Sequence, residues 1–112
     1  MVKRVLIALG GNAINQLHQK GTFSEQMGNV RVACEQIAQI ARRDYNIVIT
    51  HSNGPQVGNL AIQQEQALEM VPAQPLVVLG SMTQGQIGYM MQQSLGNILG
   101  RDDVRHVVTL VT

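Results

Sequence analysis

The chain has 112 residues, of which 45% are hydrophobic and 13% charged, and its formal net charge is +1 at pH 7. This composition is that of an ordinary globular protein, and the length permits one hydrophobic core but excludes two lobes with a cleft between them. The small net charge and the scarcity of aromatic residues disfavour nucleic-acid binding, and the single cysteine, Cys34, excludes an intrachain disulfide.

A run with β-branched residues extends from Val2 to Leu9, is apolar without a break from Val5 onward, and ends at the pair Gly10-Gly11. Such a run predicts a strand that is buried on both faces, as in a parallel sheet. The apolar stretch is too short for a signal peptide, and no stretch of the chain could cross a bilayer. We therefore expect a soluble, cytoplasmic protein.

A helical pattern follows, in which Thr22 and Glu25 have the spacing of a capping box. Apolar residues then recur at steps of three and four, which predicts one buried stripe, while Gln26, Asn29, Gln36 and Arg43 are expected to lie largely off it. The members of the stripe are Met27, Val30, Cys34, Ile37 and Ala41.

A second short strand is predicted over Ile47–Thr50, so the chain opens with a strand, a helix and a strand. The two strands of such a unit are parallel, and their carboxyl ends meet at one edge of the sheet. We therefore expect Gly10-Gly11 and Asn53-Gly54 to lie side by side.

The remaining sequence predicts a helix from Pro55 to about Val71, a helix over roughly Ser81–Leu99 and a third strand over Arg105–Thr112. Three strands are few for a parallel sheet, so residues 1–112 look like the N-terminal part of a larger domain.

Two glycines, Gly85 and Gly88, lie inside the predicted third helix, where each costs about 1 kcal/mol relative to alanine. A close approach of another backbone would explain them. With Met90 nearby, either packing within the chain or a dimer interface could use this surface, and the sequence does not separate the two.

The loops that follow the two strands are the candidate site. Gly10, Gly11, Asn12 and Ala13 can present backbone N–H groups to an anion, although a glycine pair can also form a simple turn with positive φ. The second loop adds His51, Asn53 and Gly54. Two such loops at adjacent strand ends would make a double cradle for phosphate oxygens.

His51 is interpreted as a positioning residue rather than a general base, because phosphoryl transfer needs positioning and charge neutralisation more than proton abstraction. The three histidines have no partners at metal-ligand spacing, so no dedicated metal site is predicted. Any metal would be Mg²⁺ that a nucleotide brings.

Three segments carry a resemblance to a known family. They are Ile7–Ile14 (IALGGNAI), Thr50–Gly58 (THSNGPQVG) and Pro75–Met90 (PLVVLGSMTQGQIGYM). Together they resemble the N-terminal motifs of carbamate kinases, in the amino acid kinase superfamily, and the likeness covers essentially the whole chain.

The resemblance implies a three-layer α/β/α fold with a mainly parallel sheet and, usually, a homodimer. It implies reversible phosphoryl transfer between ATP and carbamate, with ADP and carbamoyl phosphate as products, in the catabolism of arginine or of purine derivatives through carbamoyl phosphate. By motif, Gly10, Gly11 and Asn12 would contact the phosphoryl group, and Asn53 and Gly54 would hold carbamate or phosphate. Lys20 would lie in a loop near the mouth of the active site.

The positions of the basic residues indicate that this chain alone is incomplete. Lys3 and Arg4 lie at the wrong end of the first strand, and neither glycine loop contains a cation. Phosphoryl transfer needs Lys, Arg or Mg²⁺ to stabilise the negative charge of the transferred group. The nucleotide site and the catalytic lysines of the superfamily would lie in a C-terminal part, so we expect the fragment to be inactive by itself.

Two alternatives remain at this point. The chain could be a non-catalytic dimerisation module that pairs through Gly85, Gly88 and Met90, or it could belong to another kinase of the superfamily that acts on an acyl acid.

Overall fold

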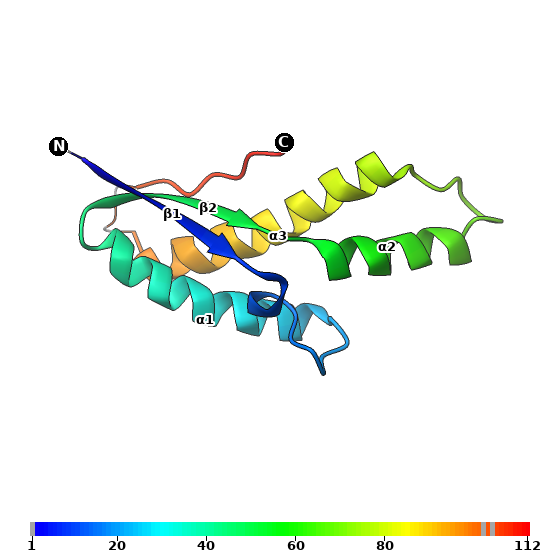
Figure 1. Ribbon diagram of the computed structural model, residues 1–112, viewed down its shortest axis with the longest axis horizontal. Helices are drawn as coiled ribbons and strands as arrows, with labels where there is room; N and C mark the ends of the chain where they lie inside the picture. Colours follow the sequence, from blue (N-terminus) through cyan, green and yellow to red (C-terminus); the bar gives the residue numbers. More distant parts are fainter. Residues whose placement is uncertain (1, 102, 104) are drawn as a thin grey trace.

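The computed structural model describes residues 2–101, 103 and 105–112. The two strands lie side by side, the first and last of the long helices run along them, and the middle one extends away from their carboxyl ends (Figure 1). In chain order the elements are β1 (Lys3–Leu9), the short 3-10 helix η1 (Gly11–Ala13), α1 (Phe23–Ala41), β2 (Tyr45–His51), α2 (Gly54–Gln66) and α3 (Leu76–Leu99). The sheet is parallel, so the predicted α/β class is confirmed.

The register of the two strands places their ends together. β1 pairs with β2 from Lys3 opposite Tyr45 to Leu9 opposite His51. The predicted strand, helix and strand unit is therefore correct, although β2 is longer than the four residues expected. Both strands deliver their following loops to the same edge of the sheet.

The prediction that β1 is buried on both faces is wrong. Side chains alternate along both strands between exposed and partly buried positions. Ile7 and Ile49 pack toward the core, whereas Leu6 is 67% exposed and Val48 is 57% exposed on the opposite face. Helices pack on one face of the sheet, and within the described residues the other face has no covering layer.

The start of α1 matches the predicted capping box. The Oγ1 atom of Thr22 accepts a hydrogen bond from the Glu25 N–H at 3.2 Å, and the Glu25 carboxylate accepts from the Thr22 N–H at 2.9 Å. The same carboxylate oxygen also accepts from the Gly21 N–H at 2.9 Å. These bonds satisfy N–H groups that a helix start would otherwise leave unpaired.

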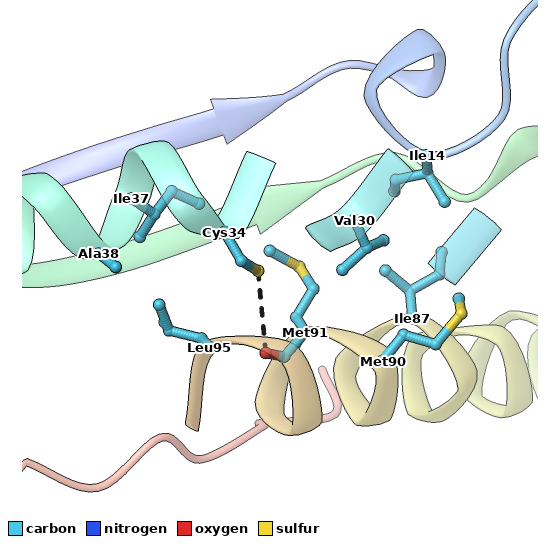
Figure 2. Packing of buried hydrophobic residues seen from close by; sticks show 9 residues of the cluster. All are labelled: Ile14, Val30, Cys34, Ile37, Ala38, Ile87, Met90, Met91 and Leu95. Atoms are coloured by element: carbon cyan, nitrogen blue, oxygen red, sulfur yellow. Dashed lines mark hydrogen bonds between the residues drawn. The ribbon is translucent and has the colours of Figure 1, made fainter. Parts of the chain in front are cut away.

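The core lies between α1 and α3 (Figure 2). The predicted stripe of α1 is confirmed, because Val30, Cys34, Ile37 and Ala41 are buried and Met27 is partly buried. α3 contributes its own buried face, made of Ile87, Met90, Met91 and Leu95. Ile14, which follows η1, closes the end of this cluster that is nearest the strand ends.

Two helix boundaries differ from the sequence prediction. α3 begins at Leu76 rather than Ser81, because Pro75 serves as its N-cap and its carbonyl accepts from the N–H groups of Val78 and Leu79. α2 ends at Gln66 rather than near Val71. Local hydrogen bonds form a turn over residues 67–70, so the apolar side chains there do not continue the helix.

The predicted third strand is absent from the sheet, which contains β1 and β2 within the described residues. Residues 105–112 lie along α3 instead (Figure 1). The side-chain amide of Gln84 bonds both backbone groups of Thr112, at 2.8 and 3.1 Å, and Thr109 donates to Gln92. The backbone N–H and C=O of Thr112 are therefore not available to a neighbouring strand.

The two helical glycines differ in their surroundings. A Cβ atom on Gly88 would lie 2.9 Å from Cβ of Thr109, whereas a Cβ on Gly85 would meet open space. Close approach within the chain therefore accounts for Gly88 but not for Gly85. Gly88 and Met90 are buried inside this chain and Gly85 is exposed, so the dimer surface expected from these residues stays a prediction.

The glycine contrast can be tested by two matched substitutions. Gly85→Ala should raise the free energy of unfolding by up to about 1 kcal/mol, because alanine favours the helix. Gly88→Ala should lower it by roughly 1–3 kcal/mol, because the added methyl would overpack against Thr109. Urea unfolding followed by circular dichroism measures both. Equal stabilities for the two variants would contradict the packing of residues 105–112 on α3.

Cys34 should be inert in the folded chain. Its side chain is fully buried, its Sγ atom lies 3.9 Å from the carbonyl oxygen of Met91, and burial raises the pKa of the thiol to about 11. At pH 8 we expect Ellman's reagent to modify it at least roughly tenfold more slowly than in 6 M guanidinium chloride. Equal rates would mean that the core between α1 and α3 is open.

The capping box should give a stability that depends on acid pH. The hydrogen bond from the Thr22 backbone N–H, together with that from Gly21, holds the pKa of Glu25 below its ordinary value of 4.5. Stability from this carboxylate is therefore complete above pH 4.5 and is lost as the pH falls through the lower folded pKa. Gln at position 25 accepts the same bonds without titrating, so thermal melts of Glu25→Gln should lack this component of the acid slope. An identical slope in both proteins would exclude Glu25 as its source.

Candidate phosphate-binding site

The two strand-end loops lie side by side, as the sequence predicts. The Ser52 N–H donates to the carbonyl oxygen of Leu9 at 3.3 Å, which continues the sheet pairing by one residue. A Cβ atom on Gly11 would lie 3.6 Å from Oγ of Ser52. Residues 10–13 and 52–54 therefore form one continuous edge, which we call the loop pair.

The first loop of the pair is a single 3-10 turn. The N–H groups of Ala13 and Ile14 donate to the carbonyl oxygens of Gly10 and Gly11 at 3.0 and 3.1 Å. Gly10 has φ −74°, and Gly11 also lies outside the left-handed region. The alternative explanation of the glycine pair, a turn that needs positive φ, is therefore wrong.

Packing within the chain does not require the glycine pair either. A Cβ on Gly10 would have no atom within 4 Å, and the nearest atom to a Cβ on Gly11 is at ordinary contact distance. Asn12 is exposed and Ala13 is half-buried beside them. The space next to this backbone is open, so a group from outside the described chain can approach it closely.

The second loop is held by its own side chains. Nδ1 of His51 donates to the carbonyl oxygen of the next residue, Ser52, at 3.2 Å, and the role predicted for His51 in positioning substrate stays a prediction. Nδ2 of Asn53 donates to Oγ1 of Thr83 at 2.9 Å, and the fully buried Thr83 donates to the carbonyl oxygen of Gly80. The Asn53 amide nitrogen thus ties the loop to α3, and this nitrogen is already engaged within the chain.

Gly54 begins α2 directly after this loop. Asn53 occupies the N-cap position of α2 but makes no side-chain cap, and Pro55 follows in the first turn. The positive end of the helix dipole and the first N–H groups of α2 therefore face the edge at which β1 and β2 end. A Cβ on Gly54 would also meet open space. This arrangement favours a bound anion.

The positive charge near the loop pair is sparse. Lys20 is exposed in the segment that joins η1 to α1, and the loop pair itself contains no Lys or Arg. Among the described residues, no three His, Cys, Asp or Glu side chains gather closely enough to hold a metal ion. Nor is any helix of the described chain long and apolar enough to cross a membrane.

Sequence reasoning missed a group of buried amides beside the loop pair. Gln26 was expected to lie off the apolar stripe, but it is 4% exposed and accepts a hydrogen bond from Gln56. The signal was present in the spacing, because residue 26 lies one helical turn before Val30 and therefore on the buried face. Gln56 lies in the first turn of α2 and is 5% exposed.

The sequence profile described as the Amino acid kinase family matches residues 3–106. The chain is 52% identical over 115 aligned residues to a carbamate kinase of Pyrococcus horikoshii. This alignment covers 100% of this chain and 37% of the relative. It is 42% identical to a carbamate kinase of Giardia intestinalis, with 98% and 35% covered. The chain thus spans little more than a third of the length of these relatives.

Solved structures give the same result. The fold matches a carbamate kinase from Giardia lamblia bound to AMP-PNP with a TM-score of 0.83 and 46% sequence identity. That match covers 86% of this chain and 34% of the other. Because sequence and fold agree along most of its length, the chain belongs to the amino acid kinase family.

Proposed function

We propose that the chain is the substrate-side part of a carbamate kinase, an enzyme that transfers a phosphoryl group reversibly between ATP and carbamate. The observation that carries the proposal is the loop pair, in which two glycine-containing loops meet at the carboxyl edge of a parallel sheet beside open space. The similarity to carbamate kinases over the whole chain supports this substrate rather than another acyl acid.

The residues of the loop pair would hold the phosphoryl group through the backbone. Gly10 and Gly11 allow phosphate oxygens to approach their N–H groups, and Asn12 adds a side-chain amide donor. The first turn of α2, which begins at Gly54, adds its helix dipole. His51 and Asn53 keep the second loop in place through their bonds to Ser52 and Thr83.

This part of the enzyme would bind and orient but would not neutralise the transferred charge. The loop pair contains no cation, and we assign no step to Mg²⁺. The nucleotide and the remaining cations would come from the rest of a protein as long as the relatives. We expect this chain alone to form no ATP from carbamoyl phosphate and ADP.

The finer aspects of the proposal follow the family resemblance. They are a cytoplasmic homodimer and a role in the catabolism of arginine or of carbamoyl phosphate. A purely non-catalytic pairing module has less support, because Gly88 and Met90 pack inside the chain.

The loop pair can be tested by titrating the ¹⁵N-labelled chain with carbamoyl phosphate, using sodium chloride at equal ionic strength as the reference. We expect the amide signals of Gly10, Gly11, Asn12 and Gly54 to shift. Gly11→Val should weaken this response roughly tenfold or more, equivalent to about 1.4 kcal/mol, because its side chain would fill the space that the anion needs.

The matched control is Gly96→Val, which adds the same side chain at an exposed, open position of α3. It should respond as the unmodified chain does. The site assignment fails if Gly11→Val and Gly96→Val respond alike, or if chloride produces the same shifts as carbamoyl phosphate.

A further inference from the structure

The segment of residues 14–21, which joins η1 to α1, is anchored at both ends by side-chain amides of α1. Nδ2 of Asn29 donates to the carbonyl oxygen of Ile14 at 2.9 Å and to Oε1 of Gln19 at 2.6 Å. Nε2 of Gln26 donates to the carbonyl oxygen of Gly21 at 2.7 Å. The exposed residues of this segment, among them Lys20, lie between the two anchors.

The second anchor continues into α2. Nε2 of Gln56 donates to Oε1 of Gln26 at 2.9 Å, and both side chains are buried. Because a carbonyl oxygen only accepts, Gln26 must turn its nitrogen toward Gly21 and its oxygen toward Gln56. The chain from Gln56 through Gln26 to Gly21, which we call the amide relay, thus has one direction.

Breaking the amide relay should destabilise this region by more than the loss of one exposed hydrogen bond would. Removing either glutamine amide leaves a buried polar partner unsatisfied, and such a group loses its hydration without compensation. Gly21 also lies close to α2, because a Cβ there would be 3.3 Å from Nδ2 of Asn59. The segment is therefore held against α2 by tight packing as well as by the amide relay.

The amide relay joins the helix that follows the second loop to the segment that follows the first loop. Gln56 lies two residues after Gly54, and Gly21 directly follows Lys20. We infer that Gln26 and Gln56 are positioning residues that hold segment 14–21, with Lys20, against the N-terminal half of α2 and beside the loop pair. This inference rests on the proposed function, because it assigns Gln26 and Gln56 to the site that the loop pair forms.

Paired substitutions test the inference. Gln26→Met and Gln56→Met each remove one amide while keeping an unbranched side chain of similar length. Their controls are Gln36→Met and Gln63→Met, which make the same change at exposed positions of α1 and α2. Because Gln56→Met acts from the far end of the amide relay, it remains informative if Gln26→Met fails to fold.

The first measurement is amide hydrogen exchange, resolved by residue. Gln26→Met and Gln56→Met should speed exchange of residues 15–21 by at least about 5-fold, as expected when a buried polar group loses its hydrogen-bond partner, without a similar change within α3. The controls should exchange like the unmodified chain. Unchanged exchange of residues 15–21 in both variants would overturn the positioning role.

The second measurement is the titration with carbamoyl phosphate. Both relay variants should bind severalfold more weakly than the controls, and the double variant should lose less than the product of the two single losses, because the residues act in one relay. If the relay variants bind like the controls, the positioning role is overturned while the proposed function stands. If the unmodified chain itself gives no response, the proposed function fails, and the exchange measurement still decides whether Gln26 and Gln56 hold the segment.

Discussion

The parallel pairing of β1 with β2 is the constraint on which the candidate site depends. Its register places Leu9 opposite His51, so the two loops that follow must begin at the same edge of the sheet. A shift of two residues would keep every side chain on its own face but would move Gly11 away from Ser52. The site is therefore a property of the backbone register first and of individual side chains second.

The hydrophobic core secures that register from one side. Buried residues of α1 and α3 face each other and cover the inner side chains of the strands, such as Ile7 and Ile49. Ile14 joins the core directly after η1, so the first loop is attached to the same packed cluster as the helices. The position of the loop pair is thus determined by packing on one face, while the opposite face of the sheet takes no part in it.

Much of this architecture could be predicted from residue patterns. The capping box at Thr22 and Glu25, the apolar stripe from Val30 to Ala41 and the β-branched runs each have a strong local signal, and each is confirmed. The burial of β1 on both faces was predicted wrongly, because a continuous apolar run does not reveal which of its faces is covered. The third strand was also predicted wrongly, because Gln84, whose side-chain amide bonds the backbone of Thr112, lies far away in the sequence and gives no local signal.

The candidate site was predictable where it depends on glycine and on strand ends, and not where it depends on buried amides. Glutamine is usually a surface residue, so composition alone gives no sign that Gln26 and Gln56 meet in the interior. Likewise, the hydrogen bond from Asn53 to Thr83 joins the second loop to a helix thirty residues further along the chain. Contacts of this kind become visible only when the three-dimensional arrangement is known.

The separation in sequence of the two paired strands also bears on how the chain reaches its native state. Neither strand has a partner until the nineteen residues of α1 have brought Tyr45 back to Lys3, so the sheet contains no local hairpin that could nucleate it. Closing such a long loop costs entropy before any strand pairing offsets it, whereas α1 can gain hydrogen bonds turn by turn. Helix α1 can therefore form on local contacts alone, whereas the sheet, and with it the loop pair, depends on closing that loop.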